Sequence, residues 1–339
     1  MIARRVWPQG TVGGCMQLVD VFNGDADGLC ALHQLRLAEP HDDALLVTGV
    51  KRDIELLRRV PLVAGSHVTV LDVSLARNRE ALVRLLDHGM TVAYFDHHYA
   101  GDVPKHRALQ VHIDGDADVC TSMLVDRHLG GRYRAWAVVG AFGDNMGESA
   151  RSLAATLDLS GPAVDALREL GECLNYNAYG ETVDDLFVAP DALYRQLRHH
   201  ADPWHCLAQE PVLAKIRQGR ADDLARASRI RPHNPCTHAR VFVLPDAPWS
   251  RRVRGSWGNQ LAQDFPDAAH ALLTPVDGDA YVVSVRAPRR HAHGADRLCR
   301  AFPGGGGRAA AAGIDRLAHD ALADFVDAFE QAFGRDGRV

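Results

Sequence analysis

The sequence predicts an α/β protein with a doubly wound, mainly parallel sheet in an N-terminal domain, a helical connector and a smaller α/β C-terminal domain. From Gln17 onward, short apolar runs alternate with amphipathic segments of about 10 to 15 residues, the pattern of strand–helix units that build parallel sheets. The 339 residues suffice for about two domains with a buried core. Hydrophobic residues make up 47% and charged residues 24%, as in ordinary globular proteins.

The elements of the N-terminal domain follow from short apolar runs and helical periodicity. Strands are expected at Leu18–Phe22, Ala44–Thr48, His67–Leu71 and Thr91–Phe95. Helices are expected at Leu29–Leu37, Asp53–Val60 and Ala76–His88, and the pattern turns helical around Tyr133–Tyr179. In the helix before the last strand, Leu82, Leu85 and Leu86 share one face, which predicts packing against the sheet.

The predicted domains cover residues 17–183, 184–235 and 236–335. The connector is polar, rich in arginine and mostly helical, and it ends at Pro232 and Pro235, which favour a domain boundary. The expected elements of the C-terminal domain are a strand at Ala239–Leu244, a helix near Asn259–Asp264, strands at Ala269–Thr274 and Ala280–Arg286 joined by a turn at Asp277–Asp279, a glycine run and a closing helix to Phe333.

Composition excludes several classes of protein. A net charge of −5 disfavours a protein that grips long duplex nucleic acid by bulk charge. The seven cysteines are scattered and form no CxxC pair, which favours a reducing compartment, the cytoplasm. No apolar run is long enough to span a membrane, and residues 1–16 are expected to be a loose leader or a start upstream of Met16. No GxxxxGK[ST] or GxGxxG pattern indicates ATP or NAD binding.

Acidic and imidazole side chains recur directly after predicted strands or helices. In a parallel sheet these positions meet at the carboxyl edge, where ligands bind. They are Asp25 and Asp27 in NGDADG after the first strand, Asp72 after the third, Asp96, His97 and His98 after the fourth, and Asp144 after the apolar run 135–142. The sequence therefore predicts that four distant segments deliver these groups to one site.

Four carboxylates at one site require positive charge. Each close pair of like charges costs roughly 4 kcal/mol at an effective dielectric constant of about 20. Two divalent ions would balance Asp25, Asp27, Asp72 and Asp144, with His97 as the nitrogen ligand. Oxygen ligands with one imidazole favour Mn²⁺, with Mg²⁺ or Co²⁺ as alternatives. A two-metal centre activates water for in-line displacement at phosphorus, so phosphoester hydrolysis is the expected reaction.

The same residues resemble the four ordered motifs of the DHH phosphoesterase superfamily. These are NGDADG, the strand end at Asp72, Asp96-His97-His98 and Gly143-Asp144-Asn145. Val283–Arg286 and the glycine run 304–313 resemble the substrate-binding domain that accompanies the DHH domain, with its Gly-Gly-Gly-His-x-x-Ala-Ala-Gly loop. The resemblance covers most of residues 17–333.

This resemblance implies a role for each matched residue. Asp25, Asp27, Asp72, His97 and Asp144 would be metal ligands, with Asp72 as the bridge, Asp96 would orient His97, and His98 would contact the scissile phosphate. Arg286, Gly305, Gly306, Gly307 and Arg308 would bind the substrate's other end. Two departures stand out. Val21 and Asn23 replace the usual His or Asp, so that the Asn23 carbonyl becomes a candidate metal ligand, and Arg308 replaces the loop histidine.

The resulting functional prediction is a Mn²⁺-dependent phosphodiesterase that hydrolyses cyclic dinucleotides or short linear oligonucleotides (nano-RNA). RecJ-type exonucleases have a similar first motif but usually add an oligonucleotide-binding barrel, for which the sequence has no set of strands. The alternatives are a pAp phosphatase, a pyrophosphatase or exopolyphosphatase, and a non-catalytic nucleotide sensor. The expected partner is a small nucleotide, and the oligomeric state, including a homodimer, stays open.

Other interpretations of single motifs are less demanding. Asp25 and Asp27 are also suited to capping a helix, and Asp116 and Asp118 in the second GDAD are interpreted as a helix start, with Thr121 and Ser122 near the site as an alternative. His199, His200, His205 and Cys206 are interpreted as a solvated helical face in preference to a zinc cluster. Arg251, Arg252, Arg254, Arg289 and Arg290 are interpreted as solvated charge, with a rim that attracts a polyanion as the alternative.

Overall fold

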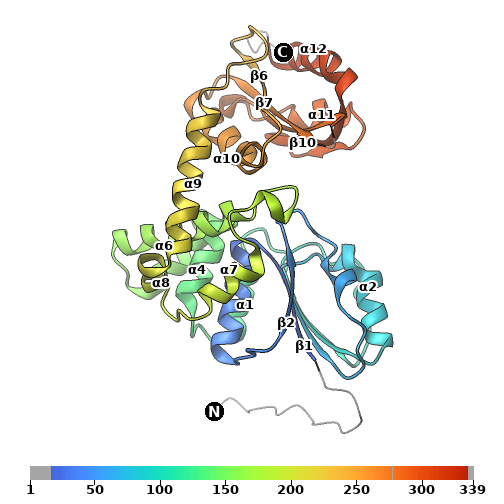
Figure 1. The fold of residues 1–339 in the computed structure, drawn as a ribbon, viewed down its shortest axis with the longest axis vertical. Helices are drawn as coiled ribbons and strands as arrows, with labels where there is room; N and C mark the ends of the chain where they lie inside the picture. The colour runs from blue at the N-terminus through green and yellow to red at the C-terminus, as the bar shows by residue number, and fades with distance from the viewer. Residues whose placement is uncertain (1–16, 277, 335–339) are drawn as a thin grey trace. The chain divides into compact units, whose positions relative to one another are not determined.

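The computed structural model describes residues 17–276 and 278–334 (Figure 1). The chain forms two compact units. Unit 1 comprises the chain up to Ala178 together with Phe187–Ile216, and unit 2 comprises Tyr179–Leu186 together with the chain from Arg217 onward. The chain passes from one unit to the other inside helix α9 (Pro211–Ala227). The predicted leader at 1–16 and Asp277 of the predicted turn lie outside the described residues.

Unit 1 is built on a five-stranded sheet in which every neighbouring pair of strands is parallel, in the order β2-β1-β3-β4-β5. The strands are β1 (Leu18–Asn23), β2 (Leu45–Gly49), β3 (His67–Leu71), β4 (Thr91–Asp96) and β5 (Leu109–Ile113). The chain moves from β1 outward to β2 and then returns to the other side of β1 at β3. This reversal places a topological switch point between β1 and β3, where the carboxyl ends of the strands open a crevice.

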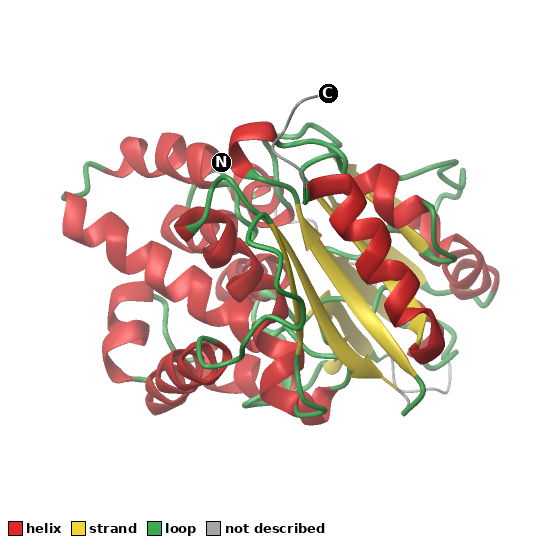
Figure 2. Ribbon diagram, turned by 90° about the horizontal axis from the view of Figure 1, so that it is seen from above, coloured by secondary structure: helices red, strands yellow, loops and turns green. Residues whose placement is uncertain are grey.

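Helices cover both faces of this sheet (Figures 1 and 2). Helix α1 (Ala26–Ala38) packs on one face and α2 (Leu75–Asp87) on the other. Leu82, Leu85 and Leu86 of α2 are buried against the sheet, as their position on one helix face predicts. The remaining helices of unit 1 are α3 (Thr121–His128), α4 (Arg134–Gly143), α5 (Gly147–Ala154), η2 (Ala155–Leu157), α6 (Gly161–Asn177), α7 (Pro190–Leu197) and α8 (Pro203–Gln209). The predicted α/β, doubly wound class is confirmed.

Two elements of unit 1 differ from the expectation. The helix expected at Asp53–Val60 is only a 3₁₀ turn, η1 (Leu56–Arg59), because the Asn78 side chain takes the backbone groups that a helix would use. Asn78 Oδ1 accepts from the Leu57 N–H at 3.2 Å and its Nδ2 donates to the Ile54 carbonyl at 2.6 Å. Strand β5 at the edge of the sheet was not expected, although Leu109, Val111 and Ile113 alternate with Gln110 and His112 as in a half-buried strand.

Unit 2 contains a second five-stranded sheet in the order β6-β7-β8-β10-β9, in which only β6 and β7 are parallel. Its strands are β6 (Ala239–Val243), β7 (Ala269–Val276), β8 (Ala280–Arg286), β9 (Gly305–Gly307) and β10 (Ala311–Ala318). Its helices are η3 (Val183–Asp185), α10 (Pro248–Asp264), η4 (Arg289–His291), α11 (Ala295–Arg300), η5 (His319–Ala321) and α12 (Leu322–Phe333). Phe325 and Phe329 of α12 are fully buried against this sheet.

The glycine run forms a hairpin, whereas the sequence predicted that a helix would follow it. Gly305–Gly307 pairs with Ala312–Ile314 in antiparallel register, and Arg308 lies in the turn, where its N–H donates to the Ala311 carbonyl at 2.9 Å. A Cβ on Gly305 would lie 1.8 Å from the Cys299 carbonyl oxygen, so close packing on α11 requires glycine there. Gly305 therefore has a structural reason, and strand β10 follows the run where a helix was expected.

The arginines at the start of α10 are held in ion pairs, although the sequence analysis expected solvated charge. Arg252 is buried and pairs with Asp223 at 2.8 Å, Arg251 pairs with Asp185 at 2.8 Å, and Arg254 pairs with Glu181 at 3.0 Å. All of these carboxylates belong to unit 2. Charge alone did not indicate this, because the acidic partners are distant in the sequence.

Replacing Tyr94 by phenylalanine is expected to lower the free energy of unfolding by about 1–2 kcal/mol. The fully buried Tyr94 hydroxyl donates to the Val73 carbonyl at 2.7 Å, and the change leaves that carbonyl without its donor. Chemical denaturation of the wild type, Tyr94→Phe and Tyr99→Phe measures the effect, because Tyr99 is 84% exposed and its variant should shift stability by less than about 0.5 kcal/mol. Equal losses in the two variants would contradict this assignment.

Candidate metal centre

The predicted acidic and imidazole residues of unit 1 meet at the carboxyl edge of its sheet. They surround a cavity of about 330 Å³ at the switch point between β1 and β3. Asn23, Asp25, Asp72, His97, His98 and Asp144 line this cavity, as do Lys51, Ser74 and Arg77. Asp27 and Asp96 lie beside it and are fully buried.

The NGDADG motif both begins helix α1 and delivers carboxylates. Asp25 is the N-cap of α1, and its Oδ1 accepts from the N–H groups of Asp27 and Gly28, each at 3.1 Å. A Cβ on Gly28 would lie 2.2 Å from the Asn23 carbonyl oxygen, so the tight turn requires glycine. The capping role expected of Asp25 and its position at the cavity therefore coexist.

Asp27 reaches across to the start of another helix. Its Oδ2 accepts from the Thr121 N–H at 2.7 Å and its Oδ1 from the Ser122 N–H at 2.8 Å. The N-cap residue of α3, Cys120, makes no side-chain capping hydrogen bond, so Asp27 supplies the capping oxygens. Thr121 and Ser122 thus lie beside the site, whereas Asp116 and Asp118 precede α3 in a loop.

Asp72 has an unusual backbone and an unfavourable electrostatic position. Its φ of +58° lies in the left-handed region, which residues other than glycine rarely adopt. Such backbone conformations are often found at functional sites. Burial, together with the charges of Asp25, Asp27 and Asp144, raises the pKa of Asp72 well above its ordinary value. Burial also raises the pKa of Asp144. Positive charge brought to this point would favour ionisation of both carboxyls.

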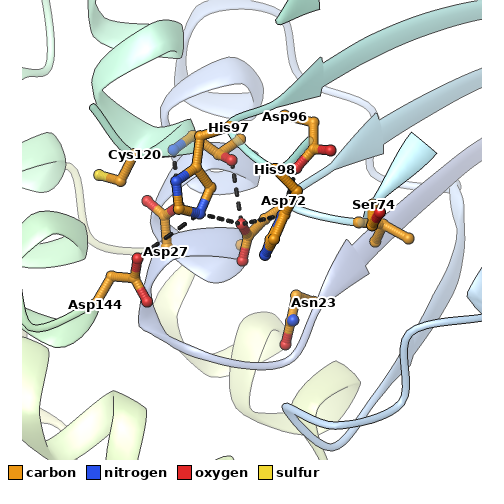
Figure 3. A network of polar contacts seen from close by, with 12 residues as sticks. Asn23, Asp27, Asp72, Ser74, Asp96, His97, His98, Cys120 and Asp144 are labelled. Carbon is orange, nitrogen blue, oxygen red and sulfur yellow. Dashed lines mark hydrogen bonds and ion pairs between the residues drawn. The ribbon is translucent and has the colours of Figure 1, made fainter. Parts of the chain in front are cut away.

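His97 lies between carboxylates from two segments (Figure 3). Its Nε2 is 3.5 Å from Asp72 Oδ1 and 3.7 Å from Asp144 Oδ2. Two groups of side chains have ligand atoms that all lie within 4.8 Å of one another, namely Asp72 with His97 and His98, and Asp27 with His97 and Asp144. Carboxylate oxygens with an imidazole nitrogen suit a divalent ion such as Mn²⁺, so the residues fit the expected metal.

Asp96 contacts His98 and not His97, which the sequence analysis expected it to orient. Asp96 Oδ1 lies 2.7 Å from His98 Nδ1. The reason is the alternation of side chains along extended backbone, which puts residues two apart on the same side. The hydrogen bond to Asp96 raises the pKa of His98, so this imidazole is favoured as a proton donor at the cavity.

Asn23, a candidate ligand through its carbonyl, uses its side chain to organise the turn. Its Oδ1 accepts from the Asp25 N–H at 3.3 Å, and its Nδ2 donates to the Lys51 carbonyl at 3.3 Å. Both contacts fix backbone segments that carry charged residues at the cavity. Asn23 therefore positions the segments that end at Asp25 and Lys51.

Two basic residues of the site, Lys51 and Arg77, were not predicted from the sequence. Lys51 follows β2, and its Nζ bonds to Asp25 and lies 3.1 Å from Asp144 Oδ1. The sequence held one signal for Lys51. Only three of the 38 basic residues are lysines, and Lys51 is one that follows a predicted strand. Arg77 and Ser74 lie at the N-terminal end of α2, where a helix attracts anions.

The predicted substrate residues belong to unit 2, whereas the acidic cluster belongs to unit 1. Arg286 is held by its neighbours, because its Nε donates to Asn259 Oδ1 at 2.8 Å and its Nη1 to Ser284 Oγ at 3.0 Å. Arg308 at the hairpin turn is exposed. Gly306 has open space where a side chain would be, so packing does not explain its glycine.

The histidines of the connector form a polar contact and no metal site among the residues described. His200 Nε2 lies 2.6 Å from Glu210 Oε1, and its Nδ1 lies 3.1 Å from His205 Nδ1. Cys206, which follows His205, is buried. No group of metal-type ligands in the described ranges includes these residues.

Comparison with known proteins gives structural matches only. No family model matches the chain, and no curated protein matches it. The solved structure of exonuclease RecJ bound to manganese matches with a TM-score of 0.59 at 19% identity, over 93% of this chain and 89% of that chain. RecJ from Thermus thermophilus in complex with Mn²⁺ matches with a TM-score of 0.53 at 17% identity, over 93% of this chain and 51% of that chain.

A third match is the pGpG-specific phosphodiesterase PggH from Vibrio cholerae, with a TM-score of 0.51 at 16% identity, over 94% of this chain and 99% of that chain. At such identities the likeness concerns the fold. The parallel sheet and the mixed second sheet have the arrangement of the DHH phosphoesterase fold. The resemblance seen in the sequence is thereby confirmed at the level of fold.

Proposed function

We propose that the protein is a Mn²⁺-dependent phosphodiesterase that hydrolyses cyclic dinucleotides or short linear oligonucleotides in the cytoplasm. The observation that carries the proposal is the convergence of Asp72, His97 and Asp144 on one cavity, with Asp27 from a fourth segment beside it. Similarity in fold to an exonuclease bound to manganese and to a pGpG-specific phosphodiesterase supports a metal-dependent phosphoesterase. The cysteines that the structure describes are free, which supports a reducing compartment.

A divalent ion bound by the carboxylates and His97 would act as a Lewis acid that activates water and neutralises phosphate charge. His98, fixed through Nδ1 by Asp96, would donate a proton or a hydrogen bond to the substrate phosphate. Arg77 and the N-terminal end of α2 would orient a phosphate oxygen at the cavity. We further propose that Arg308 and Gly306 of unit 2 bind part of the nucleotide.

One experiment tests the reaction and the substrate class together. The purified full chain is incubated with Mn²⁺ and cyclic di-GMP, cyclic GMP-AMP, cyclic di-AMP, pGpG, pAp or pyrophosphate, and the products are separated chromatographically. The proposal expects opening or cleavage of a dinucleotide diester. Phosphate release from pAp or pyrophosphate without diester cleavage contradicts it, and so does nucleotide binding without any turnover.

Replacing Arg77 by alanine is expected to raise KM about tenfold while kcat changes little. Arg77 lines the cavity and is exposed. A charge-assisted hydrogen bond from its guanidinium to phosphate would contribute about 1.5–3 kcal/mol, reduced here by solvent. Steady-state kinetics on the best dinucleotide measures the change. Arg84→Ala on the same helix, exposed and away from the cavity lining, serves as the matched control, and an equal KM in all three proteins removes Arg77 from phosphate binding.

A further inference from the structure

A lysine ammonium lies inside the acidic cluster. Lys51 Nζ bonds to Asp25 Oδ2 and lies 3.1 Å from Asp144 Oδ1 and 3.3 Å from Asn175 Oδ1. These oxygens come from the turn after β1, the end of α4 and helix α6. A divalent ion would take oxygen ligands of the same kind, so the ammonium sits where a cation is needed.

The backbone fixes Lys51 in this place. Its N–H donates to the Ala178 carbonyl at 3.0 Å, and its carbonyl accepts from Asn23 Nδ2 at 3.3 Å. Its side chain is 32% exposed, so most of it is shielded from water. The turn that holds the Lys51 carbonyl also carries Asp25, so the backbone that positions this carboxylate also positions the ammonium.

Asp25 and Asp27 are engaged differently, although the sequence treats them alike. Asp25 Oδ1 accepts from two N–H groups of α1, and its Oδ2 binds Lys51. Neither group of metal-type ligand atoms in the described ranges contains Asp25. Asp27, in contrast, belongs to the group with His97 and Asp144.

We propose that the Lys51 ammonium takes the place of one of the two dications expected from the sequence, so that the centre binds a single divalent ion through Asp27, His97 and Asp144. This deepens the proposed function, on which it rests for the role of the ion in hydrolysis. A second dication at Asp25 would meet the ammonium at close range in a largely buried site, where like charges repel strongly. Lys51 thus neutralises Asp25, and the bound ion balances the charge of the remaining carboxylates.

The test measures how many ions bind, independently of activity. Mn²⁺ is titrated into the metal-free full chain by calorimetry, bound metal is quantified by elemental analysis, and electron paramagnetic resonance distinguishes an isolated ion from a coupled pair. We expect one Mn²⁺ per wild-type chain with the spectrum of an isolated ion. Lys51→Met is expected to bind two with a coupled spectrum, because Asp25 becomes available. Lys105→Met, at an exposed loop lysine, is the matched control and should bind one.

Two ions in the wild type, or one ion in a folded Lys51→Met, overturn the inference. If Lys51→Met does not fold by circular dichroism, the wild-type count decides alone: one ion with an isolated spectrum supports the inference, and two overturn it. A wild-type chain that binds one ion but cleaves no dinucleotide contradicts the proposed function and leaves this inference standing. Diester cleavage by a wild-type chain that binds two ions supports the proposed function and overturns this inference.

Discussion

Replacement of Asp72 by alanine is expected to lower kcat at least about a thousandfold, which corresponds to roughly 4 kcal/mol of lost transition-state stabilisation. Asp72 Oδ1 lies 3.5 Å from His97 Nε2 and 3.9 Å from His98 Nδ1, so its carboxylate links the residues of the metal group to the proposed proton donor. Without it the centre loses the negative charge beside His97 and the proposed proton donor, and with it part of the arrangement that positions the reacting phosphate. Initial rates with saturating Mn²⁺ on a dinucleotide measure the loss.

The fold should survive this change. In the metal-free protein the folded Asp72 carboxyl binds its proton more tightly than in the unfolded chain, because burial and four nearby carboxylates raise its pKa. Its contribution to stability is therefore lost as the pH rises above the ordinary value of 3.8. Asparagine tolerates the left-handed backbone at this position. At pH 7 the Asp72→Asn variant should therefore unfold at a higher denaturant concentration than the metal-free wild type, and it should still be inactive. Near wild-type turnover in either variant would remove Asp72 from the metal centre.

The sequence predicted the parallel sheet and the site at its edge for one physical reason. Alternation of buried strands and amphipathic helices sets the direction of each strand, and Asp72 and Asp96 stand at strand ends, so their meeting follows from topology. The pairing of Asp96 with His98 depends instead on which side of the chain each side chain occupies. A role assigned by resemblance did not contain that information.

The missed features depend on contacts between distant residues. Lys51 meets Asp144 across 93 positions, and no local pattern records such a pair. Asn78 prevents a helix near Leu57 by hydrogen bonding from another element. The segment after the glycine run shows the same limit. Its alanines have high helix propensity, but pairing with β8 makes Ala311–Ala318 a strand. Tertiary contacts determined the conformation in each case.

Asp27→Asn is expected to weaken Mn²⁺ binding at least about a hundredfold, whereas Asp25→Asn should weaken it far less. Loss of a direct ligand should cost at least as much as the 10–100-fold typical of an outer partner. Asp27 belongs to a metal-type group, while Asn is a good helix cap and preserves the main role of Asp25. Calorimetric titration of the two variants and the wild type gives the dissociation constants.

The same pair of variants separates binding from folding. Both Asp27 oxygens accept N–H groups at the start of α3, and an amide can present only one oxygen, so Asp27→Asn leaves a buried donor facing another donor and should cost about 1–3 kcal/mol of unfolding free energy. Asp25→Asn keeps an acceptor for α1 and should cost less. Equal loss of Mn²⁺ affinity in the two variants would mean that both carboxylates are ligands, and Lys51 would then have to leave Asp25 when the metal binds.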